Sequence, residues 1–340
     1  MAAPARKAPT IYDVAARAGV SHQTVSRFLG GFEGIRPETR EKVADSIAAL
    51  KYTPNLSARM LATNTSHRVA ALTSELVSAG PSQTMQGLAS AARAAGYLLD
   101  IITIDVDSPD SVPEAVSLLR RQEFAGIVVI AVSDAVKDAV NGVDFGVPVY
   151  IDVGPADLPG SAGTTFNALG VTMAFEHLLS LGHRHVVHLA GPTAWLAARN
   201  RADSFREFVS RHALPAYPVL VGDWTTESGY GAVLAGNIDP NVTAIVSGND
   251  QMALGAIDAL YDLGFDVPSQ ISVTGFDDIA ESAHFRPPLT TVRIDFQLQG
   301  TFLFNSLLAE IEQSATPESA TFMHPELILR KSTAVPRRSN

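Results

Sequence analysis

Apolar residues recur at helical spacing in two short stretches near the start of the chain. The first, 11–18, has Thr10 in position to cap a helix, with Asp13 three residues later and Gly19 at its end. The second follows Ser21, which is also a suitable cap. Its apolar side chains fall on one face, and the other face carries His22, Gln23, Ser26 and Arg27. Two short helices joined at a glycine predict a helix-turn-helix whose second helix enters the major groove of DNA.

A third amphipathic stretch completes this predicted head. It starts at Pro37, a residue favoured in the first turn of a helix, and Val43, Ile47 and Leu50 form its apolar face. Three helices can bury a small core of their own. We therefore expect residues 1–53 to fold as a DNA-binding head.

The next segment, 54–68, is too short to hold a helix without support. Asn55 stands near its start, and Arg59, Met60 and Leu61 follow at its centre. We expect a hinge helix and linker in which Leu61 enters the minor groove of DNA as an apolar wedge. The alternative is an ordinary linker.

From residue 69 onward, apolar runs typical of strands alternate with helical stretches. We expect strands to start near residues 69, 98, 126, 147, 185, 244 and 271. This alternation predicts parallel sheets with helices on both faces, and the remaining residues are numerous enough for two such lobes. Ligands in these folds bind beyond the carboxyl ends of the strands. A cleft between the lobes should therefore be lined by the residues that follow strands: Ser74, Asp152, Asn249 and Asp277.

Charge divides the chain in the same way. Residues 1–68 contain ten Lys or Arg against five Asp or Glu, whereas the remainder contains 15 against 30. A basic head suits the phosphates of DNA, and the acidic body, which gives the chain its net charge of −10, repels them.

Several classes of chemistry lack their sequence signals. The chain has no cysteine, which excludes disulfides and thiolate sites and suits a reducing cytoplasm. It has no apolar run long enough for a membrane span, and its first residues look like a basic arm rather than an export signal. Phosphate-loop, dinucleotide-binding and zinc-hydrolase motifs are absent, so we expect no cofactor.

Three histidines surround one predicted strand: His183, His185 and His188. A metal site would need their side chains to converge. Because His185 and His188 should face opposite sides of a strand, we expect structural or surface roles rather than metal ligation.

Five longer motifs resemble the lactose-repressor family of bacterial transcription regulators. They are TIYDVAARAGVSHQTVSR from residue 10, YTPNLSARMLA from 52, SGNDQMALGAI from 247, GFDDIAES from 275 and RPPLTTVRIDF from 286. The similarity covers residues 10–335. It implies a homodimer that binds a pseudo-palindromic operator and releases it when a small neutral sugar closes the cleft.

The resemblance also implies how the body, residues 69–335, is divided. The chain is expected to change lobes near Phe166 and Phe296. One lobe would then comprise residues 69–166 with 296–321, and the other would comprise 167–292 with 322–332.

The matched motifs and the strand ends nominate contact residues for both partners. The expected DNA contacts lie in the head and hinge: Thr10, Tyr12, Ser21, His22, Gln23, Thr24, Ser26, Arg27, Asn55, Ala58 and Leu61. The expected ligand contacts lie in the cleft: Ser74, Asp152, Phe166, Trp195, Arg201, Trp224, Asn249, Asp277 and Phe296. Carboxylate, amide and guanidinium groups can hold sugar hydroxyls by paired hydrogen bonds, and aromatic rings stack on the apolar face of a pyranose. Carboxylates would repel phosphate, which favours a neutral sugar.

Several departures separate this chain from the family member that it resembles most. Ile294 stands where that protein has a polar amide, and Trp195 and Ala197 stand where it has serines, so the pocket is less polar. A galactoside is the first expectation, and another glycoside or an oligosaccharide that stacks on Trp195 is the alternative. His22 replaces an aromatic residue that helps to select operator bases, so the operator should differ. The residues after Lys331 contain no leucine heptad to form a tetramer-forming coil.

Two other classes of protein share part of this pattern. An exported sugar-binding protein would have the two-lobed body, but it would need a signal peptide and no helix-turn-helix. A sugar-processing enzyme would need a general acid and a general base, which Asp152 and Asp277 could supply. The predicted head favours a regulator without enzymatic activity over both.

Overall fold

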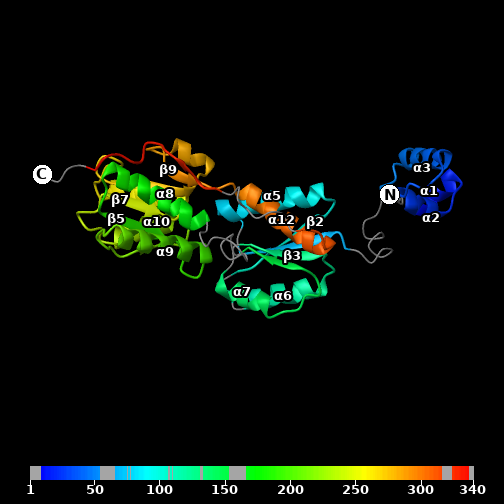
Figure 1. The fold of residues 1–340 in the computed structure, drawn as a ribbon, viewed down its shortest axis with the longest axis horizontal. Helices are drawn as coiled ribbons and strands as arrows, with labels where there is room; N and C mark the ends of the chain where they lie inside the picture. Colours follow the sequence, from blue (N-terminus) through cyan, green and yellow to red (C-terminus); the bar gives the residue numbers. More distant parts are fainter. Residues whose placement is uncertain are drawn as a thin grey trace, which may run out of the picture. The chain divides into compact units, whose positions relative to one another are not determined.

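The computed structural model describes residues 9–53, 66–74, 76, 78–105, 108, 110–130, 133–152, 166–315 and 324–336. The chain divides between His67 and Arg68 into two compact units, a helical head and an α/β body (Figure 1). Among the described residues, no helix is both long enough and apolar enough to cross a membrane.

In its described residues the head contains three helices: α1 (Ile11–Ala18), α2 (His22–Leu29) and α3 (Pro37–Leu50). Thr10 caps α1 in a reciprocal box with Asp13, whose carboxylate accepts a 2.7 Å hydrogen bond from the backbone N–H of Thr10. α1 ends at Gly19, whose φ of 66° lies in the left-handed region that glycine adopts without strain. Ser21 caps α2 by accepting a hydrogen bond from the backbone N–H of Thr24.

The three helices share a small apolar core. Val14, Val25 and Val43, one from each helix, have no exposed surface. Pro37 occupies the first turn of α3. The helix-turn-helix and third helix predicted from the sequence are therefore confirmed.

The body contains two α/β lobes, each built on one sheet. The first sheet has the order β2-β1-β3-β4 and is parallel throughout. Its strands are β1 (Arg68–Thr73), β2 (Leu98–Thr103), β3 (Gly126–Val129) and β4 (Val149–Ile151). The second sheet has the order β10-β9-β8-β7-β5-β6. Its strands are β5 (Val186–Ala190), β6 (Leu220–Val221), β7 (Ala244–Ser247), β8 (Ser272–Asp277), β9 (Thr290–Arg293) and β10 (Glu326–Ile328).

Helices connect the strands and cover the sheets. Those between strands of the first lobe are α5 (Ala79–Ala94), α6 (Ser111–Arg121) and α7 (Asp134–Asn141). Those that follow are α8 (Phe166–Leu181), α9 (Leu196–Arg211), α10 (Thr226–Ala235), α11 (Asp250–Asp262), the short 3-10 helix η2 (Ala280–His284) and α12 (Phe296–Glu312).

The path of the chain links the two lobes more than once. α12 packs beside α5 and against β3 and β4 of the first lobe, although it follows β9 of the second (Figure 1). α8 packs instead against α9, β9 and β10 of the second lobe. The chain therefore changes lobes after β4, after β9 and after α12.

All seven strands expected from the sequence are present, and the prediction of parallel sheets is confirmed with one exception. β10 pairs antiparallel with β9. The reason is that β10 enters the second lobe on the way back from α12 of the first lobe, whereas β9 runs toward that lobe. β6 and β10 were not predicted, because two or three residues are too few for an alternating pattern. β9 was not predicted either, and its Thr290 and Thr291 are fully buried despite their hydroxyl groups.

Alternate residues of the central strands face different helix layers. In the second lobe, Val246 and Phe276 pack with residues of α8 and α9, whereas Ile245 and Val273 pack with residues of α11. This packing fixes the carboxyl ends of β7 and β8, which carry functional candidates.

Candidate functional site

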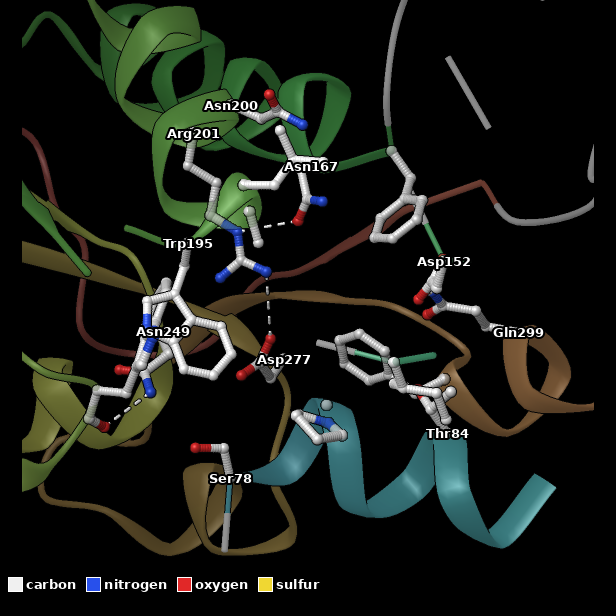
Figure 2. A pocket seen from close by; sticks show the side chains of 18 residues that line it. Ser78, Thr84, Asp152, Asn167, Trp195, Asn200, Arg201, Asn249, Asp277 and Gln299 are labelled. Atoms are coloured by element: carbon white, nitrogen blue, oxygen red, sulfur yellow. Dashed lines mark hydrogen bonds and ion pairs between the residues drawn. The ribbon is translucent and has the colours of Figure 1, made fainter. Parts of the chain in front are cut away.

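A cavity in the body is lined by residues from both lobes, beyond the carboxyl ends of β4, β7 and β8 (Figure 2). Its volume is about 140 Å³, several times what one water molecule needs. Eight of the nine residues that the sequence nominated as ligand contacts line it: Asp152, Phe166, Trp195, Arg201, Trp224, Asn249, Asp277 and Phe296. Folding thus gathers residues that lie far apart in the sequence around one space.

Arg201 and Asp277 form a buried ion pair in the wall of this cavity. Nη2 of Arg201 lies 3.8 Å from Oδ1 of Asp277, and the two side chains are 7% and 8% exposed. Nε donates a 3.0 Å hydrogen bond to Oδ1 of Asn167, and Nη1 donates to the backbone oxygen of Gly248. The guanidinium also lies 3.7 Å from the centroid of the Phe276 ring. These contacts fix the position of Arg201 in the cavity wall.

Burial sets the charges of the pair. It raises the pKa of Asp277 to about 7. The positive charge of Arg201 opposes this rise, and the negative charge of Asp250 increases it. Burial lowers the pKa of the Arg201 guanidinium, against the opposing effect of both carboxylates. Asp250 has no exposed surface and accepts hydrogen bonds from the hydroxyls of Ser282 and Thr291, and burial raises its pKa to about 6. Asp277 therefore gains or loses its proton near neutral pH.

An unusual turn at the end of β8 places Asp277 in the cavity. Asp277 and Asp278 both have left-handed backbone angles, with φ of 106° and 51°. The carboxylate of Asp278 is 6% exposed and pairs with Arg293 at 2.7 Å and with Arg330 at 2.6 Å. Because residues other than glycine rarely adopt positive φ, these two ion pairs help to hold the turn in place.

Asn249 and Trp224 are coupled to each other in the second lobe. Asn249 caps α11 by accepting a 2.9 Å hydrogen bond from the backbone N–H of Met252, and its Nδ2 donates to the backbone oxygen of Trp224 at 2.9 Å. The indole of Trp224 lies against Gly191, where an added methyl group would overlap the ring. Asn249 thus positions Trp224, and its direct contact with a ligand stays a prediction.

The first lobe contributes Asp152 and Gln299 to the cavity. Nε2 of Gln299 donates a 2.7 Å hydrogen bond to Oδ2 of Asp152. Gln299 is 6% exposed, and within the described residues its Oε1 accepts no hydrogen bond. A ligand donor that reached this buried oxygen would satisfy it. Phe296, at the start of α12, lies against Gly80 and adds an apolar surface.

The sequence nominated one residue that lies elsewhere and missed several that line the cavity. Ser74 follows β1 and is not among the lining residues, because the start of α5 supplies this part of the wall with Ser78 and Thr84. Its contact with a ligand stays a prediction. Three amides were missed: Asn167, Asn200 and Gln299. They lie on helices, which a rule based on strand ends does not cover.

The second helix of the head exposes its polar face. Val25 is fully buried, whereas the side chains on the opposite face are exposed: His22, Gln23, Ser26 and Arg27. The guanidinium of Arg27 lies 5.6 Å from the centroid of the Phe32 ring. The face is therefore available to a partner.

Other nominated DNA contacts surround this face. Tyr12 is 65% exposed, and its ring centroid lies 5.2 Å from that of His22. Ser21 and Thr24 share a 3.0 Å hydrogen bond at the start of α2, and Thr10 caps α1. Three nominated residues lie outside the described residues: Asn55, Ala58 and Leu61. The role of each of these residues in DNA binding stays a prediction.

The three histidines near β5 contact groups inside the fold. His183 bonds to Oγ1 of Thr243 at 2.8 Å, and the fully buried His188 donates to the backbone oxygen of Val246 at 2.8 Å. Burial lowers the pKa of His188 to about 4, so its ring is neutral near pH 7. Within the described part of the chain, no cluster of three or more His, Cys, Asp or Glu residues is placed to hold a metal ion.

Comparison with known proteins covers both units. Residues 10–55 match the family described as bacterial regulatory proteins, lacI family, and residues 175–333 match the periplasmic binding protein-like domain. The lactose operon repressor of Escherichia coli (strain K12) is 33% identical over an alignment of 341 residues that covers 97% of this chain and 92% of that protein. The chain belongs to the lacI family of bacterial regulatory proteins. The transcriptional regulator MalR of Streptomyces coelicolor is 31% identical across 95% of this chain and 96% of its own.

Solved structures of similar proteins extend this relationship to the fold. The lac repressor dimer bound to operator and the anti-inducer ONPF matches with a TM-score of 0.82 at 30% identity, covering 96% of this chain and 100% of that one. The complex of the regulator CelR with cellobiose matches with a TM-score of 0.69 at 26% identity, covering 95% and 99%. The predicted architecture, a helical head followed by a two-lobed α/β body, is thereby confirmed.

Proposed function

We propose that this lacI-family protein is a sugar-responsive transcriptional repressor. It binds a pseudo-palindromic operator as a homodimer and releases the DNA when an uncharged glycoside enters the cavity. Because its target is DNA, it acts in the cytoplasm. The observation that carries the proposal is the buried pair of Arg201 and Asp277 inside a cavity with aromatic walls.

The polar groups of the cavity suit hydroxyl groups. At 3.8 Å, Nη2 of Arg201 and Oδ1 of Asp277 are too far apart for a direct hydrogen bond. A ligand hydroxyl can therefore accept from the guanidinium and donate to the carboxylate at the same time. Asp152 adds a second acceptor on the side of the first lobe. Asp152 repels anions, and the charge of Arg201 is already paired with Asp277, which favours a neutral sugar over a sugar phosphate.

The apolar groups suit the other side of a sugar ring. Trp224 and Phe296 present aromatic surfaces from different lobes. The C–H face of a pyranose stacks on such rings and loses its contact with water. Related proteins have been solved with sugar ligands, the lac repressor with ONPG and CelR with cellobiose. We place a galactoside first, with another glycoside as the alternative.

The exposed face of α2 supplies the DNA-binding half of the proposal. Gln23 and Arg27 can each make two hydrogen bonds to one base edge in the major groove, and His22 lies beside them. In the proposed dimer, two such helices would contact the two halves of one operator.

The proposal excludes enzymatic turnover of the sugar. Asp277 is paired with Arg201, and Asp152 is hydrogen-bonded by Gln299, so both carboxyl groups have partners that suit binding. Release of nitrophenol from nitrophenyl glycosides would contradict this reading and favour a glycoside-processing enzyme.

Three measurements test the proposed function. Selection of the full-length protein against random duplex DNA should yield a pseudo-palindromic site. A thermal-shift screen against neutral sugars and sugar phosphates should raise the melting temperature only with neutral sugars, because a ligand that binds the folded state alone stabilises it. The best sugar should then weaken binding to the selected site. A sugar that strengthens DNA binding would contradict the proposed release.

A further inference from the structure

The cavity has a floor and a rim, and α9 contributes to both. Arg201 on the floor pairs with Asp277 at 7% and 8% exposure, whereas Arg199 pairs with Asp134 at 2.7 Å with 32% and 67% exposure. Asp134 begins α7 of the first lobe, so the exposed pair joins the lobes at the surface. The backbone oxygen of Trp195 accepts a 3.1 Å hydrogen bond from the N–H of Arg199, which places Trp195 on the same turn. Trp195, which is partly exposed, therefore lies at the rim.

The backbone of Trp195 is held from the opposite lobe. Trp195 and Ser133 form an isolated antiparallel β-bridge. Arg199 adds a 2.8 Å hydrogen bond from Nη1 to the backbone oxygen of Thr193. In Figure 2 the side chain of Trp195 extends from this anchored backbone into the cavity. Because the backbone is already anchored, only the side-chain torsions of Trp195 remain to be fixed when a ligand stacks on its ring.

The floor has aromatic surfaces of its own. Trp224 lies against Gly191 and Phe296 lies against Gly80, and both rings line the cavity. One pyranose ring held by Arg201 therefore finds apolar contacts without Trp195. The Arg201 guanidinium lies 5.6 Å from the centroid of the Trp224 ring, so Trp224 belongs to the floor, and the indole of Trp195 is an additional stacking surface.

Two polar side chains beside the cavity have no hydrogen-bond partner among the described residues. Ser78 occupies the cap position of α5, but its hydroxyl does not cap the helix. Among the described residues, the side chain of Asn200 makes no hydrogen bond either. Both line the cavity and are partly exposed. The hydroxyls of a second sugar can form hydrogen bonds with these two side chains, whereas an aryl ring cannot.

We propose that the cavity has a second subsite at its rim, where Trp195 stacks on the second ring of a disaccharide effector. This inference rests on the proposed sugar-binding function and narrows it from glycosides in general to disaccharides. The first ring lies between Trp224 and Phe296 with its hydroxyls on Arg201 and Asp277. The glycosidic oxygen points toward Trp195.

Calorimetric titration of the full-length protein with matched sugars tests the second subsite. Each disaccharide is paired with the methyl glycoside of its non-reducing sugar: lactose with methyl β-galactoside, cellobiose with methyl β-glucoside, and maltose with methyl α-glucoside. In at least one of these pairs, the wild type should bind the disaccharide about tenfold more tightly than the methyl glycoside, which is the difference expected for one aromatic contact. Trp195→Ala should remove this preference, and Trp195→Phe, which keeps a ring, should retain most of it. Circular dichroism and melting temperature check that both variants fold.

Three outcomes would overturn the inference. Equal weakening of both members of a pair by Trp195→Ala would place this indole on the first ring. A preference for a nitrophenyl glycoside without any preference for a disaccharide would assign the rim to an aryl group. A wild-type protein that binds no sugar of the panel would refute the proposed function itself, which the other two outcomes leave standing.

Discussion

The head and the body hold their candidate binding residues in opposite ways. On α2, Gln23 and Arg27 are exposed, and the core of the head is made by other residues such as Val25. In the body, Arg201 and Asp277 are almost fully buried and contact the groups that build the second lobe. Binding can therefore be altered in the head without changing stability, whereas in the body the two properties are joined.

The largest expected effect is the loss of the buried cation. Arg201→Ala leaves Asp277 unpaired and removes the donor to the Gly248 oxygen. Breaking a buried pair in this way costs about 3–5 kcal/mol of unfolding free energy. Urea unfolding at pH 8, above the pKa of about 7 that Asp277 has beside Arg201, measures it. Arg199→Ala, on the same helix but at the surface, is the matched control. Equal stabilities of the two variants would contradict the claim that the buried pair stabilises the body more than the exposed pair.

The exposed face of α2 should behave in the opposite way. Gln23→Ala and Arg27→Ala should each weaken operator binding by about 1–3 kcal/mol, the value of one good base contact. Their unfolding free energies should stay within about 0.5 kcal/mol of the wild type, as for most surface substitutions. Gel shifts with the selected operator and urea unfolding give both values. Lys42→Ala, on the exposed side of α3, is the control. A variant that loses stability together with DNA binding would show that this face is structural.

The glycine behind Trp224 offers an intermediate case. A methyl group at Gly191 would overlap the indole ring, so Gly191→Ala should displace Trp224 from the cavity wall. Overpacking of this kind costs about 1–3 kcal/mol. Sugar affinity should fall as well, while operator affinity without sugar should not change. Gly231→Ala, where an added methyl group meets open space, is the control. Unchanged sugar binding by Gly191→Ala would remove Trp224 from the site.

The contrast between the head and the body also explains which features could be predicted from the sequence. The head depends on local signals, such as the reciprocal box of Thr10 and Asp13 and the glycine that ends α1, so its helices could be predicted nearly to their ends. In the cavity, Asp152, Asn249 and Asp277 follow strands whose carboxyl ends meet, and this rule is also local.

The remaining features depend on contacts between distant residues. Asn167 and Gln299 lie on helices, and only folding shows that they face Arg201 and Asp152. The ion pairs that hold the turn at Asp278 come from positions 293 and 330, and no spacing in the sequence marks them. The bridge between Ser133 and Trp195 likewise joins two lobes whose approach no sequence pattern describes.

The titration of Asp277 gives a pH-dependent test of the buried site. Its pKa is raised from 3.8 to about 7, so the folded protein holds a proton that the unfolded chain releases between these pH values. Its contribution to stability therefore falls as pH rises from about 4 to about 7. His188 acts in the opposite direction, because its pKa is lowered from 6.5 to about 4 and protonation below pH 6.5 favours unfolding.

Comparison of the wild type with Asp277→Asn separates the effect of Asp277 on stability from that of His188. The wild type should lose stability relative to Asp277→Asn as pH rises from about 4 to about 7, and the difference should level off above that range. Melting temperatures of both proteins across this range measure it, and His188 cancels because both proteins contain it. A difference that does not change with pH would mean that Asp277 stays in one charge state.

The smallest expected effect concerns the exposed pair of Arg199 and Asp134, which joins the lobes at the rim. Exposed ion pairs contribute about 0.2–1 kcal/mol, so Arg199→Ala should barely change stability. Because a sugar must pass the rim, both its entry and its release should become up to about fivefold faster in this variant. The two tryptophans of the chain both line the cavity, so stopped-flow fluorescence reports this exchange directly.

A second ion pair on α9 supplies the control for this last prediction. Arg206 pairs with Asp203 at 2.6 Å within the helix and does not join the lobes. Arg206→Ala should leave sugar exchange unchanged. High salt should bring the wild type toward Arg199→Ala, since exposed charges are screened, and should not affect Arg199→Ala itself. If the two variants exchange sugar at the same rate, the pair of Arg199 and Asp134 has no role in sugar exchange. The backbone bridge between Ser133 and Trp195 would then be the contact that joins the lobes at the rim.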